Sequence, residues 1–138
     1  MSRKIFNFVE SNLPSENFSK LPLIPIIIKI DENNQDIIFG LIDSGSTISF
    51  IDVDIAKNIN GIIIDNAHTT GISAIIENRP VIEIIISNES MDGNWLNLKV
   101  AVIDSHHPNI SLILGRDFMI YFKQIVFDME NKKTNLEY

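Results

Sequence analysis

The chain has 138 residues, of which 45% are hydrophobic and 21% charged, and its formal net charge at pH 7 is −7. This length suits one domain with a hydrophobic core. The net charge and the scattered Lys and Arg residues argue against nucleic-acid binding, which depends on clustered basic side chains. The absence of cysteine excludes disulfides, thiolate catalysis and cysteine-ligated zinc.

No targeting segment is recognisable in the sequence. Residues 1–12 include two basic side chains but no sustained apolar core. The apolar run 21–30 is too short to span a bilayer, and Pro22, Pro25 and Lys29 interrupt it. We therefore expect a cytoplasmic protein without membrane contacts.

The first part of the chain predicts an arm followed by a hairpin. Residues 1–20 are mixed and polar, which indicates an N-terminal arm or linker before a domain at 21–138. The β-branched runs 24–30 and 37–42 predict two strands joined by the polar turn 31–36. A strand at 48–51 and a short helix at 52–58 follow.

The second part alternates short apolar runs with polar segments. We expect strands at 62–64, 74–76, 81–87, 95–103, 110–114 and 125–128, and a helix at 116–122. We expect a flexible polar stretch at 65–73, a turn at 77–80, loops at 88–94 and 104–109, and a polar tail after residue 128. The pattern predicts an all-β barrel or sandwich with one late helix.

Asp43-Ser44-Gly45 stands between two apolar runs, and the chain is organised around it. The strand before Asp43 would carry its carboxylate into an apolar interior, where an isolated charge is costly. Gly45 permits a backbone turn that a side chain would obstruct. We interpret Asp43 as a catalytic residue.

A second motif, Leu112-Ile113-Leu114-Gly115-Arg116-Asp117-Phe118, lies about seventy positions later. An apolar strand ends in glycine, and a helix begins with charged residues in its first turn. Gly115 has no side chain to obstruct the approach of another backbone segment.

In this order and spacing, the two motifs resemble those of the retroviral-type, or retropepsin-like, aspartic proteases, especially the enzymes of LTR retrotransposons and their domesticated relatives. The resemblance covers about 23–128. It implies an acid-protease barrel with one short C-terminal helix, active as a symmetric homodimer. It assigns the catalytic triplet to Asp43, Ser44 and Gly45.

Aspartic protease chemistry requires two carboxylates that share one proton, because close like charges do not both ionise easily. This chain has one Asp-Ser/Thr-Gly triplet. The resemblance therefore implies a homodimer with one Asp43 from each copy. The Ser44 hydroxyl would bond across the two-fold axis to the partner's backbone, and the Ser46 hydroxyl would donate to Asp43.

Leu114, Gly115 and Arg116 are expected to support the catalytic pair from beneath the triplet. In many retroviral enzymes an acidic residue follows the triplet and pairs with the arginine of the late motif. Thr47 takes that position here, so Arg116 needs another partner, either Asp117 or an acidic residue elsewhere. We expect Arg116 to be structural.

The family also has a glycine-bearing hairpin, the flap, which closes over the substrate. Its position matches Thr70, Gly71, Ile72 and Ser73, whose backbone would bind the peptide main chain. An ordinary surface hairpin is the alternative interpretation of this segment.

The resulting hypothesis is an aspartic endopeptidase that processes a retroelement polyprotein, in the cytoplasm or within retroelement particles. It requires a second copy and an extended peptide substrate, without a cofactor, a metal, nucleic acid or a membrane. The adjacent His106 and His107, with Asp104 nearby, do not complete a metal site. The alternatives are a catalytically silent protease-like domain for dimerisation or peptide binding, and a β-barrel with a chance triplet.

Overall fold

The computed structural model describes residues 3–10, 20–70, 76–104 and 110–138, and these ranges form a mostly β structure with a few short helices. The prediction of an all-β fold is confirmed. Neither α-helix of the described ranges has the length and apolar character needed to cross a bilayer.

The elements of the first half are β1 (Arg3–Asn7), β2 (Val9–Glu10), β3 (Lys20–Leu21), β4 (Leu23–Lys29), β5 (Gln35–Ile42), β6 (Ser49–Asp52), α1 (Val53–Asn58) and β7 (Ile63–Thr70). Those of the second half are β8 (Ile76–Ser87), the 3₁₀ helix η2 (Glu89–Met91), β9 (Leu96–Ile103), β10 (Leu112–Leu114), α2 (Arg116–Met119), β11 (Gln124–Asp128) and β12 (Lys133–Glu137). The hairpin, the strand before α1 and the short helix α1 lie close to their predicted places.

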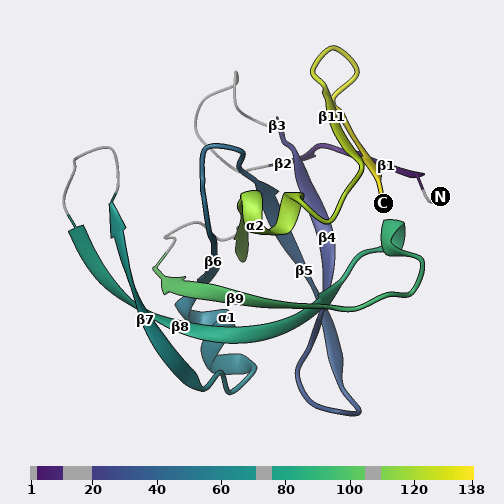
Figure 1. The fold of residues 1–138 in the computed structure, drawn as a ribbon. Coiled ribbons are helices and arrows are strands. Elements are labelled where there is room, and N and C mark those ends of the chain that lie inside the picture. The colour runs from purple at the N-terminus through teal and green to yellow at the C-terminus, as the bar shows by residue number, and fades with distance from the viewer. Residues whose placement is uncertain (1–2, 11–19, 71–75, 105–109) are drawn as a thin grey trace.

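Seven strands form one sheet in the order β4-β5-β10-β6-β9-β8-β7. β4 also pairs with β8 through Ile27–Ser87 and Ile28–Ile86, so the sheet curls into a barrel (Figure 1). Inward and outward side chains alternate along β4, where Ile24, Ile26 and Ile28 are fully buried. The β-branched run of the first hairpin therefore supplies one wall of the core.

The short strand β10 brings the two sequence motifs together. It pairs in parallel with β5, with Leu114 opposite Ile42, and antiparallel with β6, with Leu112 opposite Ile51. Leu112, Leu114 and Ile51 are fully buried. The end of β10 thus lies beside the end of β5, where Asp43 begins its turn.

The hairpin of β7 and β8 corrects two predictions. β7 continues to Thr70 and pairs with the start of β8, so residues 65–70 are not a flexible stretch. β8 runs through residues 77–80 without a turn, with Pro80 opposite Asn66. Both segments are polar because solvent reaches this hairpin, and polar composition was misread as irregular structure. Residues 71–75 lie outside the described ranges.

The chain ends form a second sheet, the terminal sheet, in the order β1-β12-β11. The predicted polar tail is wrong after Lys133, because β12 lies between the other two strands and fully buries Thr134 and Leu136. Arg3–Asn7, in the predicted arm, pair with this strand as β1. The division into an arm and a domain stays a prediction.

Helix α2 is shorter than the predicted 116–122. It ends at Met119, and the chain continues in tight turns in which Tyr121 N–H donates to the Phe118 carbonyl and Phe122 N–H to the Met119 carbonyl. Phe118 is fully buried and its ring lies 5.0 Å from that of Phe122. Phe118 and Phe122 therefore anchor the predicted helical segment in the core, while Ile120 and Tyr121 between them are exposed.

The predicted loop at 88–94 contains an ordered, buried turn. Asn88 is 2% exposed; its side-chain amide donates to the Pro25 carbonyl at 2.6 Å and its carbonyl oxygen accepts from Ser90 N–H and Ser90 Oγ. Ser90 and Met91 are also buried, and η2 packs against β1. This segment therefore joins β4 to the terminal sheet.

Replacing Asn88 by Ala should destabilise the fold. The change leaves the Pro25 carbonyl and the Ser90 donors buried without their partner, and we expect a loss of about 2–4 kcal/mol in the free energy of unfolding. Urea unfolding followed by circular dichroism measures this. Asn97→Ala, at an exposed position of β9, is the control and should change stability by less than about 0.5 kcal/mol. Equal effects would contradict the role of Asn88.

Candidate active site

Asp43, Ser44 and Gly45 form an exposed turn directly after the buried end of β5. Asp43 N–H donates to the Leu114 carbonyl at 2.8 Å, and Ser46 N–H donates to the Asp43 carbonyl at 3.1 Å. The expectation that Asp43 would lie in the apolar interior is wrong for the single chain, because the turn carries its carboxylate out of the sheet. The backbone of Asp43 is fixed while its side chain faces solvent.

The carboxylate of Asp43 has one partner supplied by its own turn. Gly45 N–H donates to Asp43 Oδ1 at 2.9 Å. A methyl group at Gly45 would lie 3.2 Å from this oxygen, so glycine keeps that side of the carboxylate uncrowded. The Ser46 hydroxyl donates to the Ile48 carbonyl at 2.6 Å. The expected hydrogen bond from Ser46 to Asp43 is therefore not made.

Gly115 is the point at which the second motif meets the turn. A Cβ atom built on Gly115 would lie 2.5 Å from the Ile48 carbonyl oxygen and 2.7 Å from the Ser46 carbonyl oxygen. Arg116 N–H donates to the Ser46 carbonyl at 2.8 Å. The close backbone approach predicted for Gly115 is confirmed, and it places β10 and α2 directly beneath the triplet.

Arg116 has a neutral partner. Its Nη2 donates to Thr47 Oγ1 at 2.9 Å, and no ion pair between Arg116 and Asp117 is present in the described structure. Thr47 thus replaces the acidic residue of the retroviral pattern in space as well as in sequence. The arginine ties the segment after the triplet to the start of α2, a structural role.

The pair of Ser49 and Asp117 was missed by the sequence reasoning. Ser49 is fully buried; its hydroxyl donates to Asp117 Oδ1 at 2.6 Å and its N–H donates to Asp117 Oδ2 at 3.0 Å. Gly115 N–H in turn donates to Ser49 Oγ at 2.9 Å. The signal in the sequence was a serine inside an apolar strand and an aspartate in the first turn of a helix, both of which need polar partners when buried.

A hollow of about 350 Å³ connects the triplet with the β7–β8 hairpin. Its lining residues are Gly45, Ser46, Thr47, Ile48, Phe50, His68 and Thr69. Thr70, expected in the flap, is the last residue of β7. The other expected flap residues, Gly71, Ile72 and Ser73, lie outside the described ranges. The described part of the hairpin therefore borders the turn that carries Asp43.

The expectation that the protein binds no metal stays a prediction. Among the described residues, no group of three or more acidic or histidine side chains could hold an ion. His106 and His107, which are not expected to complete a metal site, lie outside the described ranges. The polar groups around Asp43 are hydrogen-bonding groups of the backbone and of hydroxyl side chains.

Several solved structures share this architecture. The EIAV protease in complex with an inhibitor matches with a TM-score of 0.57 at 18% identity, covering 78% of this chain and 92% of that protein. A retropepsin-like aspartic protease from Rickettsia conorii matches with a TM-score of 0.59 at 12% identity, covering 97% of this chain and 89% of that protein. The retroviral protease-like domain of Ddi1 from Leishmania major matches with a TM-score of 0.52 at 16% identity, covering 86% of this chain and 93% of that domain.

In sequence comparisons, no protein-family profile and no curated protein matches the chain. The likeness is therefore one of structure, and it shows that the chain has a retropepsin-like fold. This confirms the fold that the two motifs predicted.

Gly115→Ala should disturb the turn from below. The added methyl collides with two backbone carbonyls, which move less readily than side chains, and we expect a loss of about 1–3 kcal/mol or more in unfolding free energy. Urea denaturation provides the measurement. Gly45→Ala is the matched control, because the atom nearest to its added methyl group would be Asp43 Oδ1 at 3.2 Å. The loss in unfolding free energy for this variant should stay below about 1 kcal/mol.

Asp117→Asn should also lower stability. An amide has only one acceptor oxygen, so its NH₂ group would face either Ser49 N–H or the Ser49 hydroxyl, and we expect a loss of about 1.5–3 kcal/mol. Asp54→Asn, in the exposed first turn of α1, is the control. Equal unfolding midpoints for the two variants would show that the Asp117 carboxylate is not required.

Proposed function

We propose that this chain, whose fold is that of the retropepsins, is an aspartic endopeptidase that works as a symmetric homodimer. The observation that carries the proposal is the geometry of Asp43. Its backbone is fixed by the Leu114 carbonyl, the turn rests on Gly115, and its carboxylate is exposed beside a hollow. A purely structural aspartate would not need an exposed carboxylate on so rigid a support.

The chemistry requires a second carboxylate, which a second copy would supply at a two-fold axis. Two adjacent carboxylates share one proton, so one acts as a base and the other as an acid. The ionised Asp43 takes a proton from water as the water oxygen attacks the scissile carbonyl carbon. The protonated Asp43 of the other copy donates to the carbonyl oxygen. The C–N bond breaks as the amine nitrogen receives the proton that the first Asp43 took from water, and one hydroxyl of the tetrahedral intermediate returns its proton to the Asp43 of the other copy. Ser44, which is exposed in the single chain, would donate across the axis to the partner's backbone.

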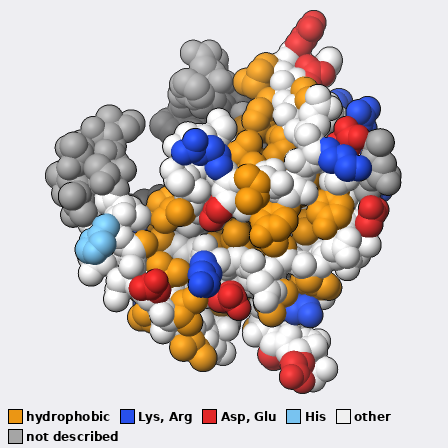
Figure 2. All heavy atoms as spheres, viewed as in Figure 1, with side chains coloured by type: hydrophobic (Ala, Val, Ile, Leu, Met, Phe, Trp, Pro, Cys, Tyr) orange, Lys and Arg blue, Asp and Glu red, His pale blue; other side chains and the backbone are white. Residues whose placement is uncertain are grey.

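The terminal sheet offers a surface for the second copy. Ile5 and Val126 are 60% and 40% exposed and flank Asn135 in register on one face of this sheet. They border a shallow hollow of about 280 Å³. Ile120 and Tyr121, just after α2, are exposed as well, and Figure 2 shows hydrophobic side chains gathered around α2. We assign the dimer contact to this face.

The substrate in this proposal is an extended peptide within a polyprotein of a retroelement. It would lie in the hollow between the triplet and the β7–β8 hairpin, where Thr70, Gly71, Ile72 and Ser73 would bind its main chain. The reaction would take place in the cytoplasm or within retroelement particles. A catalytically silent domain that binds peptides is the competing function.

Asp43→Asn should abolish proteolysis, because an amide cannot act as the base. The assay is cleavage of an unstructured protein between pH 3.5 and 7.5 for the native chain, Asp43→Asn and the control Asp54→Asn. We expect the native and control chains to be active and inhibited by a statine-type compound. A folded dimer without activity at any of these pH values would favour the silent peptide-binding domain.

Val126→Asp should separate the two copies. A charge at this exposed apolar position would be buried unpaired in the dimer, which is costly, whereas the single chain tolerates it. Sedimentation velocity should show a folded monomer, and activity should fall at least tenfold. Met129→Asp, exposed in the β11–β12 turn, is the control. A dimer that persists in Val126→Asp would contradict the assigned contact face.

A further inference from the structure

The barrel wall has a gap on one edge of β8. β7 pairs with β8 from Ile76 as far as Ile82, whose partner is Ile63. On the same edge of β8, β4 pairs only with Ile86 and Ser87. In the described structure, residues 83–85 pair with β9 on one side and have no strand on the other. Since backbone groups alternate between the two sides of an antiparallel strand, part of this interval presents unpaired backbone groups.

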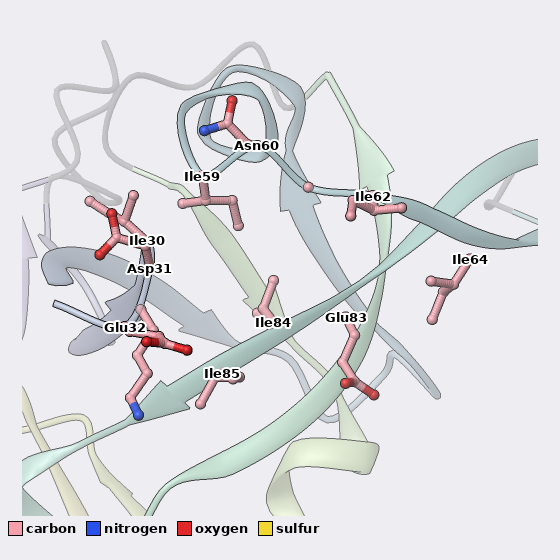
Figure 3. Close-up of a pocket in the computed structure, with 12 residues that line it drawn as sticks. Ile30, Asp31, Glu32, Ile59, Asn60, Ile62, Ile64, Glu83, Ile84 and Ile85 are labelled. Atoms are coloured by element: carbon pink, nitrogen blue, oxygen red, sulfur yellow. The ribbon is translucent and has the colours of Figure 1, made fainter. Parts of the chain in front are cut away.

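A groove of about 480 Å³ lies at this gap. Three segments surround it (Figure 3): the turn after β4, the connection from α1 into β7, and the open interval of β8. Its lining residues are Lys29, Ile30, Asp31, Glu32, Ile59, Asn60, Gly61, Ile62, Ile64, Glu83, Ile84 and Ile85. The groove thus combines an open strand edge with surrounding side chains from sequence-distant segments.

Isoleucine side chains give the groove an apolar lining. Ile62 and Ile64 are 78% and 50% exposed, which is high for side chains of this size in a folded domain. A β-bulge between Ile63 and Asp65 leaves Ile64 out of register with β8. The pairing of Ile63 and Asp65 with β8 holds Ile64 at the surface, and Ile62 directly precedes this strand.

The charged residues of the groove are mostly acidic. Asp31, Glu32 and Glu83 contribute three carboxylates. The hydrogen bond from the Asn34 side chain, with backbone N–H donors of the same turn, lowers the pKa of Asp31 and keeps it ionised. The one basic side chain, Lys29, places its ammonium group 4.5 Å from the ring centroid of Trp95.

We propose that this groove binds an extended segment of a partner protein, with apolar residues flanked by Lys or Arg. The segment adds as a short strand to the open edge at residues 83–85, its apolar side chains cover Ile62 and Ile64, and its basic side chains meet the three carboxylates. The acidic groove charge and the net charge of −7 select a basic partner over an acidic one or a second copy of this chain.

The groove is separate from the candidate active site. β5 begins next to the turn that borders the groove and ends at Ile42, directly before Asp43, and its eight residues span roughly 25 Å at about 3.4 Å per residue. Binding at the groove therefore does not depend on catalysis by Asp43, and the two proposals can fail independently.

The binding test uses NMR of the ¹⁵N-labelled Asp43→Asn variant, which is not expected to cleave the peptide. The probe is the peptide acetyl-Lys-Val-Ile-Val-Lys-amide, and acetyl-Glu-Val-Ile-Val-Glu-amide is its acidic counterpart. We expect the basic peptide to produce saturable chemical-shift changes at the amides of residues 60–64 and 83–85. The acidic peptide should bind at least tenfold more weakly, and added salt should weaken the binding of the basic peptide.

Two substitutions locate the site. Ile62→Ser should weaken binding of the basic peptide about tenfold, because an apolar contact is lost from a side chain that the fold does not need. Glu83→Gln removes one charge without a change of shape and should weaken binding several-fold. Met129→Ser, at a side chain 65% exposed in the β11–β12 turn, is the control and should bind as the parent does.

Four results would overturn the proposal. The first three are the absence of saturable changes up to about 1 mM peptide, equal affinity for both peptides, and shift changes that Ile62→Ser leaves unaltered. The fourth is concentration-dependent self-association that Ile62→Ser abolishes, because a second copy would then be the occupant. Activity of the native chain does not enter any of these outcomes.

Discussion

The contact of one glycine with two carbonyl groups determines how the structure is assembled. Gly115 approaches the carbonyl oxygens of Ser46 and Ile48 so closely that no side chain fits between them. This approach lets β10 lie between β5 and β6 and places Leu114 where its carbonyl accepts from Asp43 N–H. The rigidity of the catalytic candidate therefore comes from backbone contacts, and the side chains of the triplet remain available for chemistry.

Two charged side chains beneath the turn each bond to a neutral residue. Asp117 accepts two hydrogen bonds from Ser49, and Arg116 donates one to Thr47. An ion pair between Arg116 and an acidic residue is thus replaced by three charge-to-neutral hydrogen bonds. Such bonds are stronger than neutral ones and hold both ends of the loop without bringing another carboxylate near Asp43.

The sequence predicted the parts of the structure in which local pattern and tertiary role agree. The apolar runs of the first hairpin and the two motifs around Asp43 and Gly115 belong to this group. Prediction failed where polar residues form regular structure. In the β7–β8 hairpin the segments around Thr70 and Pro80 are strands because they pair with each other. The polar tail around Leu136 is a strand because β12 pairs with a distant part of the chain. The buried role of Asn88 depends on the Pro25 carbonyl, 63 residues away, which no local pattern reveals.

The central position of β12 in the terminal sheet has a consequence for the order in which the chain can fold. β1 precedes the other strands in the chain but has no strand neighbour in this sheet until β12 has left the ribosome. The barrel can form earlier, since its strands lie between residues 23 and 114. Because the exposed side chains of Ile5 and Val126 are aligned only through β12, synthesis of β12 becomes the event that creates the surface on which two copies would meet.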